Sequence, residues 1–289
     1  MTSYQTITVH PIAGALGAEI GGVALGDGVD DATFAEVNRA LVDHQVVFLR
    51  GQRASPAALK AFAARFGKLY VHPYAQGLPG HPEVMPVVRE TDDVGRVFGG
   101  SWHTDLTFEA EVVMGSVLYA VEVPDHGGDT LFSSQAAAYA ALSDGLKQTL
   151  IGLDAVHSAS AAFGPTTVAG ARAMGLKTVA EPDEVVHPVV RVHPESGRRG
   201  LFVNRLNTRR IAGWTAAESA PLLEFLFAHA TRPEFTCRFR WQTGSVAVWD
   251  NRAVQHLAIA DYDGARREMQ RVTICGDRPY GVRQSAAAD

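Results

Sequence analysis

After residue 100 the sequence reads as one strand-like segment after another, and this succession constrains the fold more than any other feature. The segment 235–242 alternates apolar and polar residues without a break, which is typical of a strand with one buried face. Similar runs occupy 116–123, 187–193, 199–203, 245–250 and 269–275. Because strands are not alternating regularly with helices, the pattern favours a β-sandwich or barrel over a parallel α/β sheet.

Helices are expected around this β-rich part rather than within it. The sequence predicts helices at 31–44, after the Ser55-Pro56 start signal, at 136–153 and after the capping box Thr215-Ala216-Ala217-Glu218. No G-x-G-x-x-G turn joins a strand to a helix, so a dinucleotide-binding fold is not indicated. We find no repeat and no linker, and expect a single domain over 1–289. The segment 158–183 is poorly periodic and rich in Ala, Gly and Thr, as in a lid or binding loop.

Composition excludes several classes of protein. The 289 residues are 46% hydrophobic and 20% charged, which is ordinary for a globular chain. A net charge of −5 does not indicate a nucleic-acid-binding face. No apolar run is long enough to span a bilayer, and no signal peptide is evident, so a membrane partner is not expected. The two cysteines, Cys237 and Cys275, suit a reducing compartment, and a cytoplasmic location is expected.

The segment Ser101-Trp102-His103-Thr104-Asp105 places an imidazole and a carboxylate two residues apart. If the segment is a strand, both side chains leave the same face and could meet at a divalent metal ion. A hydrogen-bonded strand pair without metal fits the same spacing. Two further His-x-Glu matches, at 81–83 and 193–195, carry a central proline in loop-like surroundings, which makes a central-strand site improbable there.

A third metal ligand is expected from a distant strand, and His256 is the best candidate. With His103 and Asp105 it would complete the two-histidine, one-carboxylate triad of non-heme iron oxygenases. Beyond it, Arg267 and Arg271 share one face of a strand-like run. No carboxylate shares that face within the run, so the arginines either bind anions in a barrel interior or lie exposed on an edge strand.

These blocks together resemble the TauD/TfdA (taurine dioxygenase-like) family of Fe(II)/2-oxoglutarate-dependent dioxygenases. The resemblance covers about 250 residues in the family's order. It runs through Trp102-His103-Thr104-Asp105, Gly127-Gly128-Asp129-Thr130-Leu131, His187-Pro188-Val189-Val190-Arg191, Trp249-Asp250-Asn251-Arg252, Gln255-His256 and Arg271-Val272-Thr273-Ile274.

The resemblance implies a mainly β fold with flanking helices, the double-stranded β-helix or jelly roll. It implies that His103, Asp105 and His256 bind Fe(II), and that Thr130 and Arg267 bind the distal carboxylate of the cosubstrate 2-oxoglutarate. Oxygen would complete the reaction, with succinate and CO2 formed as a substrate carbon is hydroxylated. A homo-oligomer, a dimer or tetramer, is also implied.

The resemblance implies a small anionic substrate. Arg271 and His72 match the residues that bind sulfonate in the taurine enzymes. Gly99, Ala159 and Asn207 stand where those enzymes have an asparagine and two phenylalanines, which predicts a roomier pocket of different polarity. We therefore expect a larger sulfonate or an alkyl sulfate, with release of sulfite or sulfate.

Three alternatives stay open at this point. The same chemistry on a carboxylate such as an aryloxyalkanoate would also need Arg271. A zinc hydrolase could use the same three ligands, and a non-catalytic metal-binding jelly roll could keep the fold. The matches at Arg267 and Thr130 disfavour the last two.

Overall fold

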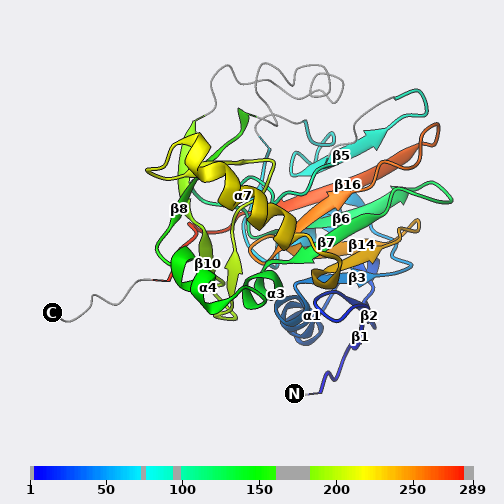
Figure 1. Cartoon of the computed structure of the whole chain (residues 1–289). Coiled ribbons are helices and arrows are strands. Elements are labelled where there is room, and N and C mark those ends of the chain that lie inside the picture. Colours follow the sequence, from blue (N-terminus) through cyan, green and yellow to red (C-terminus); the bar gives the residue numbers. More distant parts are fainter. Residues whose placement is uncertain (1–2, 73–75, 94–98, 161–182, 283–289) are drawn as a thin grey trace.

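The computed structural model describes residues 3–72, 76–93, 99–160 and 183–282 of the chain (Figure 1). Its strands gather into a large sheet and several smaller ones. The large sheet has the order β1-β2-β3-β14-β6-β16-β4, with β5 also paired to β16. These strands are β1 (Thr8–Pro11), β2 (Ala18–Gly21), β3 (Val46–Leu49), β14 (Val246–Asp250), β6 (Gly115–Glu122), β16 (Arg267–Ile274), β4 (Leu69–Tyr70) and β5 (Val84–Arg89).

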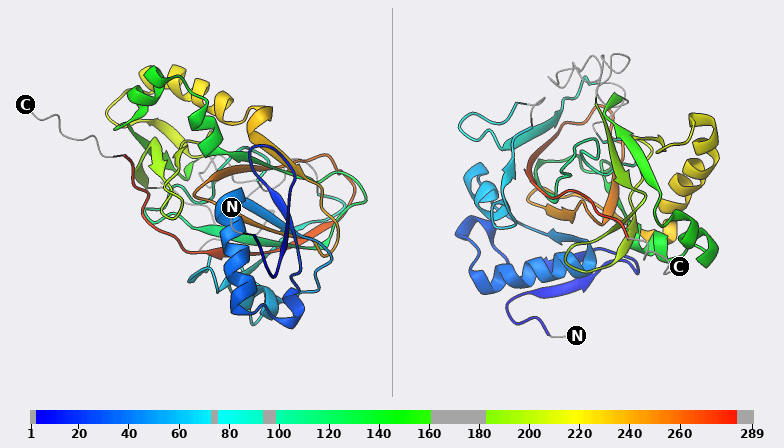
Figure 2. Two further views of the ribbon diagram at one scale, coloured as in Figure 1. Left: turned by 90° about the horizontal axis from the view of Figure 1, so that it is seen from below. Right: turned by 90° about the vertical axis from the view of Figure 1, so that its left-hand side faces the viewer.

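A second sheet faces the large one, and the chain passes between them repeatedly. Its order is β13-β7-β15, from β13 (Thr236–Phe239), β7 (Thr130–Ser134) and β15 (Val254–Ala258). Two smaller sheets are separate from it: one has the order β12 (Thr208–Ile211), β8 (Asp154–Ser158) and β9 (Glu184–Pro188), and the other pairs β10 (Val190–Val192) with β11 (Arg199–Leu201). Seen from one end, the strands form a ring of ribbons with helices outside it (Figure 2, right). This is the predicted jelly roll.

Aromatic side chains from both sheets fill much of the space between them. Phe48 of β3 stacks on Phe239 of β13 with ring centroids 4.0 Å apart, and its ring also contacts Phe132 of β7. Trp249 and Met269 belong to the same cluster. The two faces are thus joined by buried apolar surface, the main favourable contribution to folding.

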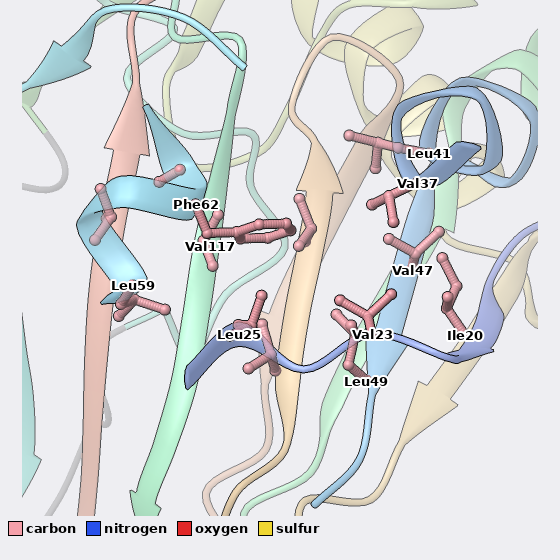
Figure 3. Packing of buried hydrophobic residues seen from close by; sticks show 14 of the residues in the cluster. Ile20, Val23, Leu25, Val37, Leu41, Val47, Leu49, Leu59, Phe62 and Val117 are labelled. Atoms are coloured by element: carbon pink, nitrogen blue, oxygen red, sulfur yellow. The ribbon is translucent and has the colours of Figure 1, made fainter. Parts of the chain in front are cut away.

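Helices cover the outer faces of the sheets. Side chains of α1 (Asp31–His44) and α2 (Pro56–Ala63) pack on the large sheet, where Val37 and Leu41 meet Val47, and Phe62 lies by Val117 (Figure 3). On the other side lie α3 (Gln135–Ala140), α4 (Asp144–Leu150) and α7 (Ala216–Ala230), in a cluster with β8–β12 (Figure 1). Two short 3-10 helices, Leu25–Asp27 and Pro233–Phe235, complete the described helices.

Local signals explain where these helices start. Asp30, Ser55 and Thr215 cap α1, α2 and α7 through side-chain oxygens that accept backbone N–H groups, and the predicted capping box at Thr215–Glu218 is confirmed. The single helix expected over 136–153 is wrong. The segment is divided into α3 and α4 because Ser143 caps a new helix, accepting a hydrogen bond from the Leu146 N–H at 3.3 Å. Most of the expected loop at 158–183 lies outside the described residues.

Leu226 of α7 is fully buried in the cluster with β8–β12, whereas its neighbour Phe225 is 50% exposed. We expect Leu226→Ala to lower the free energy of unfolding by about 2–5 kcal/mol, because it leaves a cavity in packed core. Phe225→Ala is the matched control and should cost clearly less. Urea denaturation of the three proteins measures both effects, and equal losses would contradict this packing.

Candidate active site

His103 and Asp105 lie together, but not on the strand that the spacing suggested. His103 forms an isolated antiparallel bridge with His256 of β15, through backbone hydrogen bonds of 3.1 and 2.8 Å. The chain turns immediately afterwards, and Leu106 adopts a left-handed conformation with φ +50°. The condition that this segment forms a strand is therefore not met beyond the single bridge at His103. The two side chains converge because a single bridge is followed by a tight turn.

The three predicted ligand side chains meet in the interior. Asp105 Oδ1 lies 3.4 Å from His103 Nε2 and 3.7 Å from His256 Nε2. The two imidazole ring centroids are 4.2 Å apart, and all three residues are buried. Among the residues that the structure describes, they form the one group of three such side chains with donor atoms close enough to hold a metal ion.

Hydrogen bonding and ionisation suit this group to a metal. His103 Nδ1 donates to the carbonyl of Ser101 at 2.7 Å, so Nε2 is the ring nitrogen that faces Asp105. Burial, and next the neighbouring His103, lower the pKa of His256 well below its usual value, so its ring is neutral. Burial raises the pKa of Asp105, but Arg271 and the histidines outweigh it and hold that pKa well below the ordinary value. Two imidazole nitrogens beside a carboxylate are the donors that a divalent iron site uses.

Arg271 has a partner that the sequence did not reveal. Its Nη2 donates to Asp105 Oδ2 and, at 2.9 Å, to the hydroxyl of Ser116, which also accepts from Arg271 Nε at 3.1 Å. The strand run itself offers no carboxylate on this face, and Asp105 reaches the arginine from a different segment. Ser116 and Asp105 engage the Nε and Nη2 edge of the guanidinium, and no hydrogen bond of Nη1 is seen within the described residues.

Arg267 differs from Arg271 in its surroundings. It lies on the same face of β16 and is buried, yet within the described residues it forms no ion pair and its Nε has no hydrogen-bond partner. β16 pairs with β6 on one side and with β4 and β5 on the other, so the edge-strand alternative is wrong. A buried guanidinium without a protein anion is suited to hold an anionic ligand.

Thr130 lies in the same cavity as Arg267, along with His103, His256 and Arg271. The Trp241 indole N–H donates to the Thr130 hydroxyl at 2.9 Å, so the hydroxyl proton stays available to a ligand. Sequence reasoning missed Trp241 and Ser116. Trp241 stood in the most regular strand pattern of the chain, which carries no signal of a polar role.

A second cavity adjoins the first and shares Gly99, His103 and Arg271 with it. Predicted substrate residues His72 and Asn207 line this cavity. Much of its remaining wall is apolar, from Tyr70, Pro82, Met85, Leu106, Phe108 and Leu206. Ala159 is buried but is not among the described residues that line either cavity, so its role stays a prediction.

Gly99 is placed where a side chain would intrude. Its φ is +77°, and an added Cβ would lie 3.3 Å from the His103 ring. Burial, and next Arg271, lower the pKa of His72 to about 4 despite the opposing effect of Asp105. His72 is therefore neutral at pH 7 and can offer a ring N–H to an anion without carrying charge.

His193, in the second of the two further His-x-Glu matches, has a structural role. Its Nε2 lies 2.9 Å from Asp250 Oδ2, while its Nδ1 accepts backbone N–H groups of Glu195 and Ser196. Arg252 also binds Asp250. His193, Asp250 and Arg252 thus form a buried hydrogen-bond network. Because Asp250 and Arg252 directly flank Asn251, the network orders the turn at Asn251.

A buried histidine lies behind the Asp105 turn and gives a pH prediction. His157 Nδ1 is 3.1 Å from the Thr107 hydroxyl, and burial, followed by the nearby His187, lowers the pKa of His157 to about 3. The unfolded chain binds a proton below about pH 6.5 that the folded protein excludes, so stability is lost as the pH falls from there toward 3. We expect His157 to account for about 1 kcal/mol of lost unfolding free energy between pH 7.5 and 5.5.

Denaturation at the two pH values tests this contribution. His157→Gln should lose less stability than the wild type over that interval, and His10→Gln, at an exposed position, should behave as wild type. An unchanged pH dependence in His157→Gln would contradict the assignment.

Comparison with known proteins agrees with this geometry. The family model described as taurine catabolism dioxygenase TauD, TfdA family matches residues 8–273. An α-ketoglutarate-dependent sulfate ester dioxygenase of Pseudomonas putida is 39% identical over 284 residues, covering 96% of this chain and 92% of the relative. An alkylsulfatase of Acinetobacter baylyi is 34% identical, covering 96% and 88%.

A solved structure extends the likeness to three dimensions. The crystal structure of a taurine dioxygenase from Burkholderia xenovorans is 38% identical, with a TM-score of 0.81, covering 96% of this chain and 93% of that chain. No helix in the described residues has the length and apolar character of a membrane span. The family match and the identities to these relatives show that the chain belongs to the taurine catabolism dioxygenase TauD, TfdA family and is a 2-oxoglutarate-dependent dioxygenase.

Proposed function

We propose that this protein is an Fe(II)- and 2-oxoglutarate-dependent dioxygenase that hydroxylates the carbon bearing an organosulfur group, with an alkyl sulfate as the preferred substrate. The observation that carries the proposal is the cavity in which Arg271 and His72 lie beside His103 and Asp105. In this cavity the anionic group of a substrate would contact Arg271 and His72, and its alkyl chain would contact the apolar residues. Sulfate ester and alkyl sulfate activity in relatives over 30% identical supports the same class.

In this proposal His103, Asp105 and His256 hold the iron. Arg267 binds the distal carboxylate of 2-oxoglutarate as an ion pair, and the Thr130 hydroxyl, oriented by Trp241, donates to the same group. When bound, iron and 2-oxoglutarate supply with O2 the oxidant that abstracts a hydrogen atom, while 2-oxoglutarate becomes succinate and CO2.

The substrate side depends on Arg271 and His72. Their donors would bind the sulfate oxygens and so fix which carbon lies beside the metal, since positioning decides which bond reacts. The carbon attached to the ester oxygen is hydroxylated. The resulting hemiacetal-like product breaks its C–O bond to sulfate, leaving an aldehyde and hydrogen sulfate.

Further expectations belong to the same proposal. One TauD/TfdA-like domain would span residues 1–289, assembled as a dimer or tetramer, which light scattering would measure. Both cysteines are free thiols, which is consistent with a cytoplasmic location. A carboxylate substrate such as an aryloxyalkanoate is the second candidate, because Arg271 would bind either anion.

A substrate panel tests the proposed class. Alkyl sulfates of increasing chain length, alkanesulfonates, taurine and aryloxyalkanoates are incubated in air with Fe(II), 2-oxoglutarate and ascorbate. We expect succinate, aldehyde and sulfate in equal amounts from alkyl sulfates, with longer chains preferred over taurine because of the apolar wall. Turnover of aryloxyalkanoates alone, with phenol release, would replace the organosulfur class by the carboxylate class.

The cosubstrate site is tested at Arg267, the first residue of β16, and at Arg266 just before it. Arg267→Ala removes the buried cation and should lower kcat/KM for 2-oxoglutarate about 100-fold, as expected for loss of one partner of a buried ion pair. Arg266→Ala, which breaks ion pairs with Glu90, Glu122 and Glu268 at the surface, should change it less than threefold. Equal effects of the two variants would remove Arg267 from the proposed site.

A further inference from the structure

Asp105 lies beyond the end of the pairing that orders the rest of its segment. Before it, Gly99 and His103 bond to β15: the Ala258 N–H donates to Gly99 at 2.9 Å, and His103 exchanges two hydrogen bonds with His256. After His103 this pairing stops and the chain enters the turn at Leu106. The buried N–H and C=O of Asp105 therefore need partners from outside a sheet.

The carboxamide of Asn251 supplies both partners. Asn251 Oδ1 accepts from the Asp105 N–H at 2.9 Å, and Asn251 Nδ2 donates to the Asp105 carbonyl at 2.9 Å. The same Nδ2 donates to the Val113 carbonyl at 3.2 Å. The side-chain amide thus takes the place of a strand neighbour at the single residue that supplies the carboxylate.

Asn251 is itself held rigidly. It is 1% exposed and directly follows β14, and its own N–H donates to the Met114 carbonyl at 2.8 Å. Asp250 before it and Arg252 after it are joined in the buried network with His193. A fixed amide of this kind can restrict the backbone of Asp105 as strand pairing restricts His103 and His256.

We infer that Asn251 is a positioning residue for the metal site: it aligns the Asp105 carboxylate with the two imidazoles without contacting metal or substrate. The inference rests on the proposed function, in which Asp105 is an iron ligand. Arg271 donates to Oδ2 of the Asp105 carboxylate, and Asn251 hydrogen-bonds to the Asp105 backbone. Groups that orient a metal ligand typically change metal affinity 10- to 100-fold when removed.

The chain offers a matched control in Gln52. This buried carboxamide makes the same three bonds far from the site: Oε1 accepts from the Leu25 N–H, and Nε2 donates to the Val23 and Arg50 carbonyls. Asn251→Ala and Gln52→Ala therefore lose equivalent hydrogen bonds, and only the first should alter the metal site.

The experiment is titration of the metal-free proteins with Co(II), read by visible absorption, with the thermal midpoint Tm of each metal-free protein measured alongside. We expect the Kd of Asn251→Ala for Co(II) to rise 10- to 100-fold over wild type and that of Gln52→Ala to stay within twofold, although both lower Tm. Asn251→Asp keeps the acceptor but turns an oxygen toward two carbonyls. It should weaken Co(II) binding in the same direction, and it replaces Asn251→Ala if that variant fails to fold.

The outcomes separate the inference from the function on which it rests. Wild-type affinity for Co(II) in Asn251→Ala or Asn251→Asp, with Tm lowered as in Gln52→Ala, would reduce Asn251 to a structural residue. An equal loss of affinity in Gln52→Ala would do the same. A wild-type protein that binds no Co(II) would overturn the proposed metal site itself.

Discussion

Two backbone hydrogen bonds between His103 and His256 join segments that are far apart in the chain, and the arrangement of the site depends on them. They fix one histidine on a turn against another on β15. β15 is itself paired with β7, whose Thr130 lines the cavity that contains Arg267. A displacement of this bridge would move the candidate metal donors together with the strands that line that cavity.

Arg267 and Arg271 have the same position relative to the sheet but differ in whether a carboxylate compensates their charge. Arg271 forms an ion pair with Asp105, whereas Arg267 is buried with no ion-pair partner among the described residues. Burying an uncompensated cation is costly, so the Arg267 site is stabilised when an anion enters. Metal at Asp105 would draw charge from that carboxylate and leave more of the Arg271 charge for a substrate anion.

Much of the fold and of the site could be predicted because local patterns coincide with global ones. The alternating strand at Thr236–Phe239 and the capping box at Thr215 are local signals that the fold retains. The convergence of His103, Asp105 and His256 was predicted from the order of the family motifs. Same-face strand geometry does not explain it, because the chain turns at the left-handed Leu106, and such a turn has no clear sequence signal. The contacts of Ser116 and Trp241, like the partner of Arg271, arise between distant segments and could not be read from spacing.

The two adjoining cavities draw their walls from different kinds of structure. The cavity that contains Arg267 is lined largely by strand residues, among them Leu118, Thr130 and Met269. The other takes much of its lining from connecting segments, including Phe108 and Leu206. Loops tolerate sequence change far better than paired strands do. Such a protein can therefore acquire new substrates during evolution by altering one wall, while the machinery that consumes 2-oxoglutarate is inherited unchanged.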